Sequence, residues 1–196
     1  MKKLIILIFG FVFVLMGCKK EDTSPAASAM TPLSSIQIVP HKIGNRWNLR
    51  SVNFTSHDTN YFANSIIKDT LIGLELWFIE EFGNAGSSVP TKNKNDGLYF
   101  YHNTINSGEL AYKYPAQVND GYYSSYYNDS IIVLSINSTV TVPAGTFNCY
   151  QYFTYRLWGT YAGYIYVSPE IGFVKSESYI NNVLSSNVEL ISYHLN

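Results

Sequence analysis

Cys149 and the four histidines are the first candidates for nucleophilic chemistry. Cys149 lies in a run that alternates apolar and polar residues, and the histidines are scattered at positions 41, 57, 102 and 194. A catalytic thiol needs a base and an electropositive, partly open site. None of these histidines belongs to a recognised Cys/His motif, and a lone cysteine in a strand usually packs as a small apolar residue. We interpret Cys149 as structural, with a nucleophile as the alternative.

Paired carboxylates and metal-ligand motifs are the next candidates. Glu80 and Glu81 are adjacent, but neighbours on a strand point to opposite faces, so we predict a solvated strand end rather than a glycosidase pair. The H-E-x-x-H and C-x-x-C motifs are absent. Residues 93–97 are rich in Asn and Asp but lack the distal Glu of a calcium loop. We predict no metal, no cofactor and no enzymatic activity, with a hydrolase that uses distant carboxylates as the alternative.

Aromatic residues are the most unusual feature, with 17 Tyr and 11 Phe in 196 residues. They gather in two clusters, and rings with polar tips suit the binding of glycans, peptides or lipids. The alternative is ordinary packing on half-exposed faces of a sheet, which is common for tyrosine in β proteins. The candidate ligand-binding residues are Tyr122, Tyr123, Tyr126 and Tyr127 in the first cluster, and Tyr150, Tyr152, Trp158, Tyr161, Tyr164 and Tyr166 in the second.

Charge and composition restrict the partners and the fold. The formal net charge is −1 and charged residues make up 14% of the chain, which excludes a basic nucleic-acid binder. The abundance of Tyr and Phe favours strands over helices. The chain has the length of a single domain, so its core can form without disulfides or metal.

The first residues have the pattern of an export signal. Met1–Lys3 is a charged segment, and Leu4–Met16 is an apolar segment too short for a comfortable membrane span. Leu15-Met16-Gly17-Cys18 then resembles the lipobox of bacterial lipoproteins. That resemblance implies cleavage after residue 17 and acylation of Cys18. Two or three acyl chains would form a durable membrane anchor.

The residues after Cys18 resemble the sorting signals of Gram-negative lipoproteins. Lys19–Asp22 has no Asp directly after the cysteine, which implies transfer to the outer membrane. The charged run also resembles the surface-export signal of Bacteroidota lipoproteins, so we expect cell-surface exposure, with a periplasm-facing domain as the alternative. Residues 18–35 form a Ser/Ala/Pro-rich tether, and residues 36–196 form the folded domain.

Short alternating segments separated by turn residues predict an all-β domain. Phe147–Arg156 is the clearest strand, and Asn181-Asn182 predicts the turn of the last hairpin. Residues 83–96 contain little that could be buried, so we expect the longest loop there, and residues 168–172 suit one short helical turn. We predict one antiparallel curved sheet that forms a barrel, half-barrel or sandwich.

Three motifs resemble a group of uncharacterised envelope lipoproteins. The P-x-x-x-G-N-x-W motif matches Pro40–Trp47, V-P-A-G-T-F-x-C-Y matches Val142–Tyr150, and G-x-V-K matches Gly172–Lys175. The resemblance implies a curved antiparallel β domain and no known reaction. Asp69-Thr70-Leu71 and Asp129-Ser130-Ile131 also resemble the O-glycosylation sites of exported Bacteroidota proteins, with Thr70 and Ser130 as the acceptors.

These observations together predict a non-enzymatic outer-membrane lipoprotein. Its β domain would bind a glycan, a lipid or an envelope protein, and it would contact the membrane through its N-terminal acyl chains. Two alternatives stay open, a periplasmic carrier of acyl chains and a hydrolase of cell-wall or glycan substrates.

Overall fold

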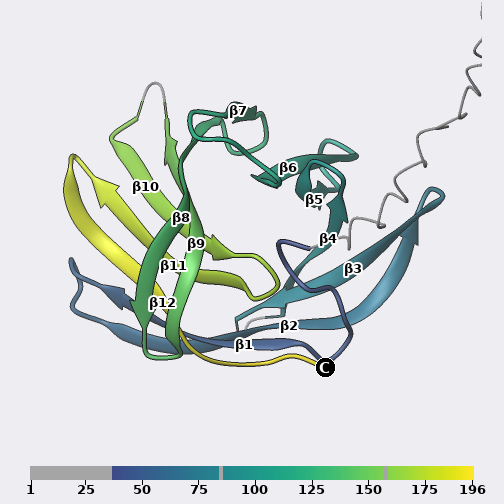
Figure 1. The fold of residues 1–196 in the computed structure, drawn as a ribbon, viewed down its shortest axis with the longest axis horizontal. Coiled ribbons are helices and arrows are strands. Elements are labelled where there is room, and N and C mark those ends of the chain that lie inside the picture. Colours follow the sequence, from purple (N-terminus) through teal and green to yellow (C-terminus); the bar gives the residue numbers. More distant parts are fainter. Residues whose placement is uncertain (1–36, 84–85, 157–158) are drawn as a thin grey trace, which may run out of the picture. The chain divides into compact units, whose positions relative to one another are not determined.

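A computed structural model describes residues 37–83, 86–156 and 159–196, and Figure 1 shows its fold. The signal sequence, Cys18 and Trp158 lie outside these residues, so the roles assigned to them stay predictions. The described residues form twelve strands, which are β1 (Arg46–Asn53), β2 (Thr59–Ile72), β3 (Glu75–Phe82), β4 (Ser87–Lys94), β5 (Gly97–His102), β6 (Ser107–Lys113), β7 (Gly121–Ser124), β8 (Asp129–Val142), β9 (Gly145–Tyr155), β10 (Tyr161–Ser168), β11 (Gly172–Ile180) and β12 (Val183–His194).

All twelve strands belong to one antiparallel sheet that curls into a nearly closed barrel (Figure 1). This confirms the predicted fold class and selects the barrel among the three predicted forms. The short helical turn expected at residues 168–172 is a plain turn, in which Glu170 has a φ of 66°. Within the described residues, no helix is long and apolar enough to cross a membrane.

The order of the strands places the two ends of the domain in the middle of the sheet. The order is β6-β5-β4-β3-β2-β1-β12-β11-β10-β9-β8-β7, so the first strand pairs with the last. Trp47 of β1 is opposite Tyr193 of β12, and Asn53 is opposite Ser186. The two edge strands, β6 and β7, follow each other directly in the chain.

Side chains rather than a backbone ladder join these two edges, and we call this junction the seam. The Tyr122 hydroxyl donates to the backbone oxygen of Ala111 at 2.7 Å. The Tyr152 hydroxyl, on β9, donates to the backbone oxygen of Lys113 at 2.8 Å. The barrel is therefore closed by a few tyrosine and carboxylate contacts across the seam.

One predicted loop is a strand. Residues 83–96 were expected to form the longest loop, but β4 occupies residues 87–94 and pairs with β3 and β5. Its inner face carries the buried Thr91, opposite Phe78 and Phe100. On its outer face, Lys92 and Lys94 lie over the ring of Trp77. The sequence of this strand looks hydrophilic, but its long lysine side chains cover the apolar ring of Trp77.

Two tight turns follow the sequence closely. Asn181 and Asn182 have φ values of 52° and 62° between β11 and β12, as a type I′ hairpin turn requires. Gly145 has a φ of 137° at the start of β9, a conformation that other residues adopt only with strain. The hairpin at Asn181-Asn182 was predicted and is present, and a second hairpin joins β8 to β9.

The segment before β1 closes one end of the barrel. Ile38 and Val39 are buried in the core, and Asn93 donates to the backbone oxygen of Val39 at 2.7 Å. The His41 ring stacks on Phe78 at 5.1 Å between ring centroids. Burial lowers the pKa of His41 to about 4, so this histidine is neutral at physiological pH.

Cys149 belongs to the core. Its side chain is fully buried, and burial raises the pKa of its thiol to about 12. A thiol in this setting is not a nucleophile at neutral pH. The position agrees with the structural interpretation of this residue.

Candidate functional site

The barrel has an open end that is opposite the N-terminal segment, and we call it the mouth. β5 ends at the mouth with His102 and β8 begins there with Asp129, and both residues line the same cavity. A cavity of about 240 Å³ extends from the mouth into the barrel. We call it the larger cavity to distinguish it from a smaller cavity of about 60 Å³ in the same barrel, which is described below. The lining of the larger cavity comes from six strands and is mainly aromatic or aliphatic: Phe100, His102, Glu109, Leu110, Ala111, Tyr112, Ser124, Tyr127, Asp129, Ile131, Tyr152, Thr154, Tyr161 and Ile165.

Three aromatic rings mark the entrance. The His102 ring stacks on Tyr126, with centroids 3.7 Å apart and planes 9° apart. Tyr127 meets both rings edge-on, at 5.5 Å from His102 and 4.9 Å from Tyr126. An open cleft of about 530 Å³ lies on the other side of these rings and shares Phe100, His102 and Tyr127 with the larger cavity. The group therefore stands between solvent and the interior.

Glu109 of β6 holds the entrance in place. Its carboxylate accepts hydrogen bonds from Ser124 at 2.7 Å, from Ser125, and from the backbone N–H of Tyr126 at 3.1 Å. Burial acts to raise the pKa of Glu109, but the hydrogen bonds from Ser125, Ser124 and Tyr126 outweigh it and lower the pKa. Glu109 is therefore ionised at neutral pH, and it links β6 to the residues after β7.

Asp129 is the second carboxylate at the mouth. It is buried and pairs with the Arg156 Nε at 2.8 Å. The Arg156 guanidinium lies over the ring of Tyr161 at 5.5 Å. The charge of Asp129 is therefore compensated from outside the cavity, and the pair fixes Tyr161 against the cavity wall.

Glu80 is at the bottom of the site. It lines a smaller cavity of about 60 Å³, which shares Phe100 and Tyr112 with the larger one. Glu80 is only 7% exposed, and Asn64 Nδ2 donates to its Oε1 at 3.4 Å. Burial raises the pKa of Glu80 to about 7, against the opposing effect of the Asn64 hydrogen bond.

The predicted solvated strand end at Glu80-Glu81 is therefore wrong for Glu80. The two side chains do lie on opposite faces, since Glu80 lines the interior and Glu81 is half-buried. Glu80 shares its face with Phe78 and Phe82, which pack into the interior. The apolar character of that face overrode the preference of a carboxylate for water.

The first tyrosine cluster surrounds the mouth. Tyr126 and Tyr127 are 44% and 45% exposed and stand at the entrance. Tyr122 points into the barrel, where burial raises its pKa. Tyr123 is 54% exposed and faces away from the cavity.

The second cluster is split between the two faces of the sheet. Tyr152 and Tyr161 line the larger cavity, and Tyr150 packs against the core beside Tyr114. Tyr164 and Tyr166 lie on the outer face, because β10 turns Ile165 to the cavity between them. The structure therefore separates residues that lie together in the sequence.

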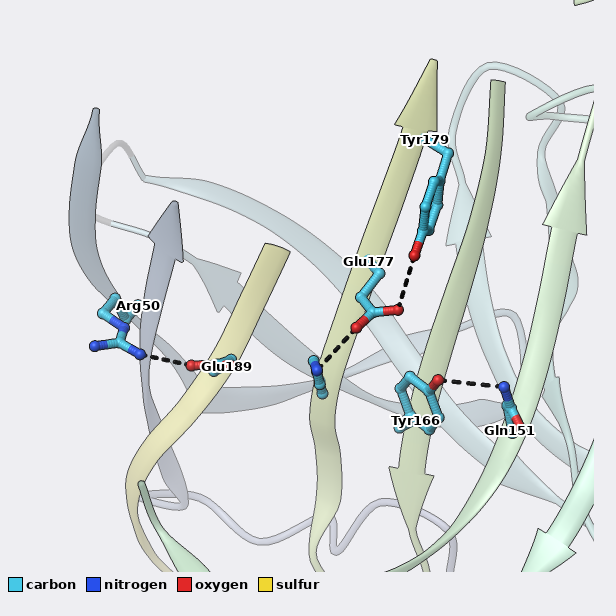
Figure 2. Close-up of polar contacts among 7 residues, drawn as sticks. Arg50, Gln151, Tyr166, Glu177, Tyr179 and Glu189 are labelled. Carbon is cyan, nitrogen blue, oxygen red and sulfur yellow. Dashed lines mark hydrogen bonds and ion pairs between the residues drawn. The ribbon is translucent and has the colours of Figure 1, made fainter. Parts of the chain in front are cut away.

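The outer face carries a row of polar contacts across five neighbouring strands, β1, β12, β11, β10 and β9 (Figure 2). Arg50 pairs with Glu189 at 2.6 Å, and Glu177 accepts from Tyr179 at 3.3 Å. The Gln151 amide donates to the Tyr166 hydroxyl at 3.2 Å. Tyr166 and Tyr179 here serve the solvated face of the sheet, as in the packing alternative for the tyrosines.

The two candidate glycosylation residues lie on strands. Thr70 is partly exposed on β2 near the turn at Gly73, and Ser130 is partly exposed at the start of β8. The structure leaves both hydroxyl groups near the surface. Among the described residues, no group of three or more metal-ligating side chains converges.

Sequence reasoning missed Glu80, His102, Glu109 and Asp129 as site residues. For Glu80 there was a signal, because the alternation of Phe78, Glu80 and Phe82 puts the carboxylate on an apolar face. The other three meet only because β5, β6 and β8 converge at the mouth. That convergence depends on the barrel's closure, which has no local pattern in the sequence.

Two solved structures have the same fold. One is described as a "putative exported protein with YmcC-like fold" from Bacteroides fragilis, with 17% identity and a TM-score of 0.50 over 80% of this chain and 98% of that chain. The other is described as a "putative lipoprotein" from Parabacteroides distasonis, with 16% identity and a TM-score of 0.50 over 81% of this chain and 99% of that chain. At these identities the likeness shows the fold alone. No family model matches the sequence, and a search of curated proteins finds no significant match.

Proposed function

We propose that this chain is a non-enzymatic lipoprotein of the outer membrane whose β domain binds a small, partly apolar molecule inside the barrel. The observation that carries the proposal is the larger cavity, which opens to the cleft past the rings of His102, Tyr126 and Tyr127. Concave sites lined by aromatic side chains with a few polar groups are typical of small-molecule binding.

The size of the cavity limits the ligand. Its volume of about 240 Å³ is below the roughly 300–1,000 Å³ of sites for drug-sized ligands. Much of the barrel interior is filled by core residues such as Trp47, Leu98 and Val133. A ligand of one ring, or a short chain, fits this space better than a long acyl chain, so we favour small-molecule binding over acyl-chain transport.

Membrane anchoring through Cys18 completes the proposal. The lipobox at residues 15–18 supports it, and so do the descriptions of the two structures with this fold as an exported protein and a lipoprotein. The intact mass of the native protein should show acyl additions that disappear in Cys18→Ser. Additions of sugar mass, lost in Thr70→Ala or Ser130→Ala, would support glycosylation in the same measurement.

Native mass spectrometry of the mature protein, purified from the envelope of its host, tests ligand binding. We expect a bound small mass that is lost on denaturation. The double variant Tyr126→Ala/Tyr127→Ala should reduce its occupancy by at least about tenfold. The matched control is Tyr164→Ala/Tyr179→Ala, which removes two tyrosines that contact each other on the outer face, 5.7 Å apart, and should keep the ligand. Equal loss in both double variants would contradict a site at the mouth.

A hydrolase is the second candidate, because His102, Glu109 and Asp129 line one cavity. Two observations weigh against it. Glu109 is held ionised by three neighbours, which makes it a poor general acid, and Asp129 is paired with Arg156. Release of sugars from cell-wall glycans by the purified protein, abolished in Glu109→Gln, would favour the hydrolase and refute the binding proposal.

A further inference from the structure

The charges along the site are all acidic. Glu80, Glu109 and Asp129 line the two cavities, and no Lys or Arg is among the described residues that line them or the open cleft. His102 is the one basic side chain there. Burial lowers its pKa, against the raising effect of Glu109, so it adds no positive charge at neutral pH. Because Arg156 compensates Asp129, the uncompensated charge along the site is negative and comes from Glu109 and from the ionised form of Glu80.

In the described part of the chain neither Glu80 nor Glu109 has an ion-pair partner, whereas Asp129 pairs with Arg156. Glu80 differs from Glu109 because it accepts one hydrogen bond, from Asn64 at 3.4 Å, whereas Glu109 accepts from Ser124, Ser125 and Tyr126. Its neighbour Asn64 is 8% exposed, and Asn64 Oδ1 is buried without a hydrogen-bond partner there. Both residues line the smaller cavity. A buried acceptor without a partner costs about 1–3 kcal/mol, so Asn64 Oδ1 is an acceptor that a donor group of a ligand could satisfy.

Several donors of the interior are already used. The Trp47 Nε1 donates to the backbone oxygen of Ile171 at 2.6 Å. The hydroxyl groups of Tyr122 and Tyr152 donate to backbone oxygens across the seam. The hydroxyl of Tyr112 lines the smaller cavity as well and can donate or accept. The charged groups of the lining are carboxylates, and a ligand with a cationic hydrogen-bond donor complements them.

The walls around the acceptors suit an apolar body that carries positive charge. Phe100 and Tyr112 line both cavities, with ring centroids 6.3 Å apart and planes 73° apart. Tyr127, Tyr152 and Tyr161 line the larger cavity beyond them. Aromatic faces attract ammonium groups, and a carboxylate at the end of the pocket adds a charge-assisted hydrogen bond.

We propose that Glu80 and Asn64 bind the primary amino group of a cationic ligand whose apolar body fills the larger cavity. This inference rests on the proposed function, because it names the ligand class of the same site. It also excludes free fatty acids and acidic sugars as ligands, because their carboxylates would meet Glu80 and Glu109 with no cation nearby.

Binding of an ammonium group should release a proton from Glu80 near neutral pH. In the empty protein the carboxyl is partly protonated because its pKa is about 7. The other titratable side chain that lines its cavity is Tyr112, whose raised pKa keeps it neutral. His102, Glu109, Asp129, Tyr127, Tyr152 and Tyr161 face the larger cavity. Removal of Glu80 alone should therefore remove the proton release.

The experiment is isothermal titration of the full mature protein with three matched probes. They are phenethylamine, 2-phenylethanol and 3-phenylpropionate, which share a phenyl ring and differ in the charge of the end group. We expect phenethylamine to bind at least about tenfold more tightly than 2-phenylethanol, and 3-phenylpropionate not to bind. Titration in buffers of different ionisation enthalpy reports the proton release.

Two variants and one control assign the effect. Glu80→Gln keeps the size of the side chain, and it should weaken phenethylamine at least tenfold while leaving 2-phenylethanol within about twofold. Asn64→Leu should also weaken the amine. Glu81→Gln makes the same chemical change at the neighbouring residue on the opposite face, and it should leave both affinities unchanged.

The outcomes separate the inference from the proposed function. Equal binding of the amine and the alcohol, or an unchanged amine affinity in Glu80→Gln, overturns the inference and leaves small-molecule binding intact. Tight binding of 3-phenylpropionate also overturns it. Failure of all three probes, together with a protein that carries no bound mass from its host, overturns both.

Discussion

Replacement of Glu80 by Gln should stabilise the protein at high pH and have no effect at low pH. Glu80 is buried, and its pKa rises from 4.5 to about 7 on folding. The folded protein therefore binds a proton at Glu80 more tightly than the unfolded chain does. The stabilising contribution of the protonated carboxyl is complete below pH 4.5 and is lost as the pH rises through 7.

The size of the effect follows from the pKa. A rise of this size corresponds to about 3 kcal/mol between the two protonation states. Gln is neutral at every pH, so the difference in free energy of unfolding between Glu80→Gln and the native protein should grow from near zero at pH 4.5 to about 3 kcal/mol at pH 8. For a domain of this size, that is a rise in Tm of about 6–12 °C.

Urea unfolding at several pH values, followed by tryptophan fluorescence, measures this difference. Trp47 and Trp77 are buried, so their emission should report loss of the core. Glu81→Gln is the control and should show a small difference that does not depend on pH. A Glu80→Gln difference that is the same at pH 4.5 and pH 8, or a less stable variant at pH 8, would refute the reasoning.

Three further predictions concern other buried groups. Burial lowers the pKa of His41 to about 4, so as the pH falls the unfolded chain is protonated at His41 before the folded protein is. The free energy of unfolding should therefore fall by up to about 3 kcal/mol between pH 6.5 and 4. In His41→Gln the urea midpoints should fall less over this range. Tyr152→Phe removes the hydrogen bond to the Lys113 oxygen and should cost about 1–3 kcal/mol in urea unfolding, whereas an unchanged midpoint would mean that the seam contact adds no stability. Cys149 is fully buried, so a thiol reagent should label it in denaturant but not in the native protein, and rapid native labelling would contradict the buried position.

The fold class was readable because each strand carries its own pattern. Phe147–Arg156 alternates along its length, and Asn181-Asn182 supplies the turn that a hairpin needs. The strand at residues 87–94 was missed because its apolar contacts are made by lysine stems over Trp77, which look polar in a sequence. Which strands pair with each other could not be predicted from the sequence either, because backbone hydrogen bonds are the same for every residue type.

The site was predictable only in part. Tyr126 and Tyr127, which were expected in a ligand surface, stand at the entrance of the cavity. Tyr164 and Tyr166 were grouped with Tyr161 by closeness in sequence, but a strand sends alternate residues to opposite faces. Glu109 has no local signal at all, since its partners Ser124, Ser125 and Tyr126 come from the end of the next strand and the turn after it.

The pairing of β1 with β12 has a consequence for how the domain is completed. Ten of the eleven neighbouring strand pairs join strands that follow each other in the chain, and β1–β12 is the exception. Two six-stranded halves, β1–β6 and β7–β12, can therefore assemble from local hairpins, but β1 and β12 each remain an unpaired edge until they pair with each other. A chain that emerges from a ribosome or a translocation channel with its N-terminus first cannot finish this sheet until β12 is free. Loss of β12 would accordingly leave two open half-sheets rather than a smaller barrel.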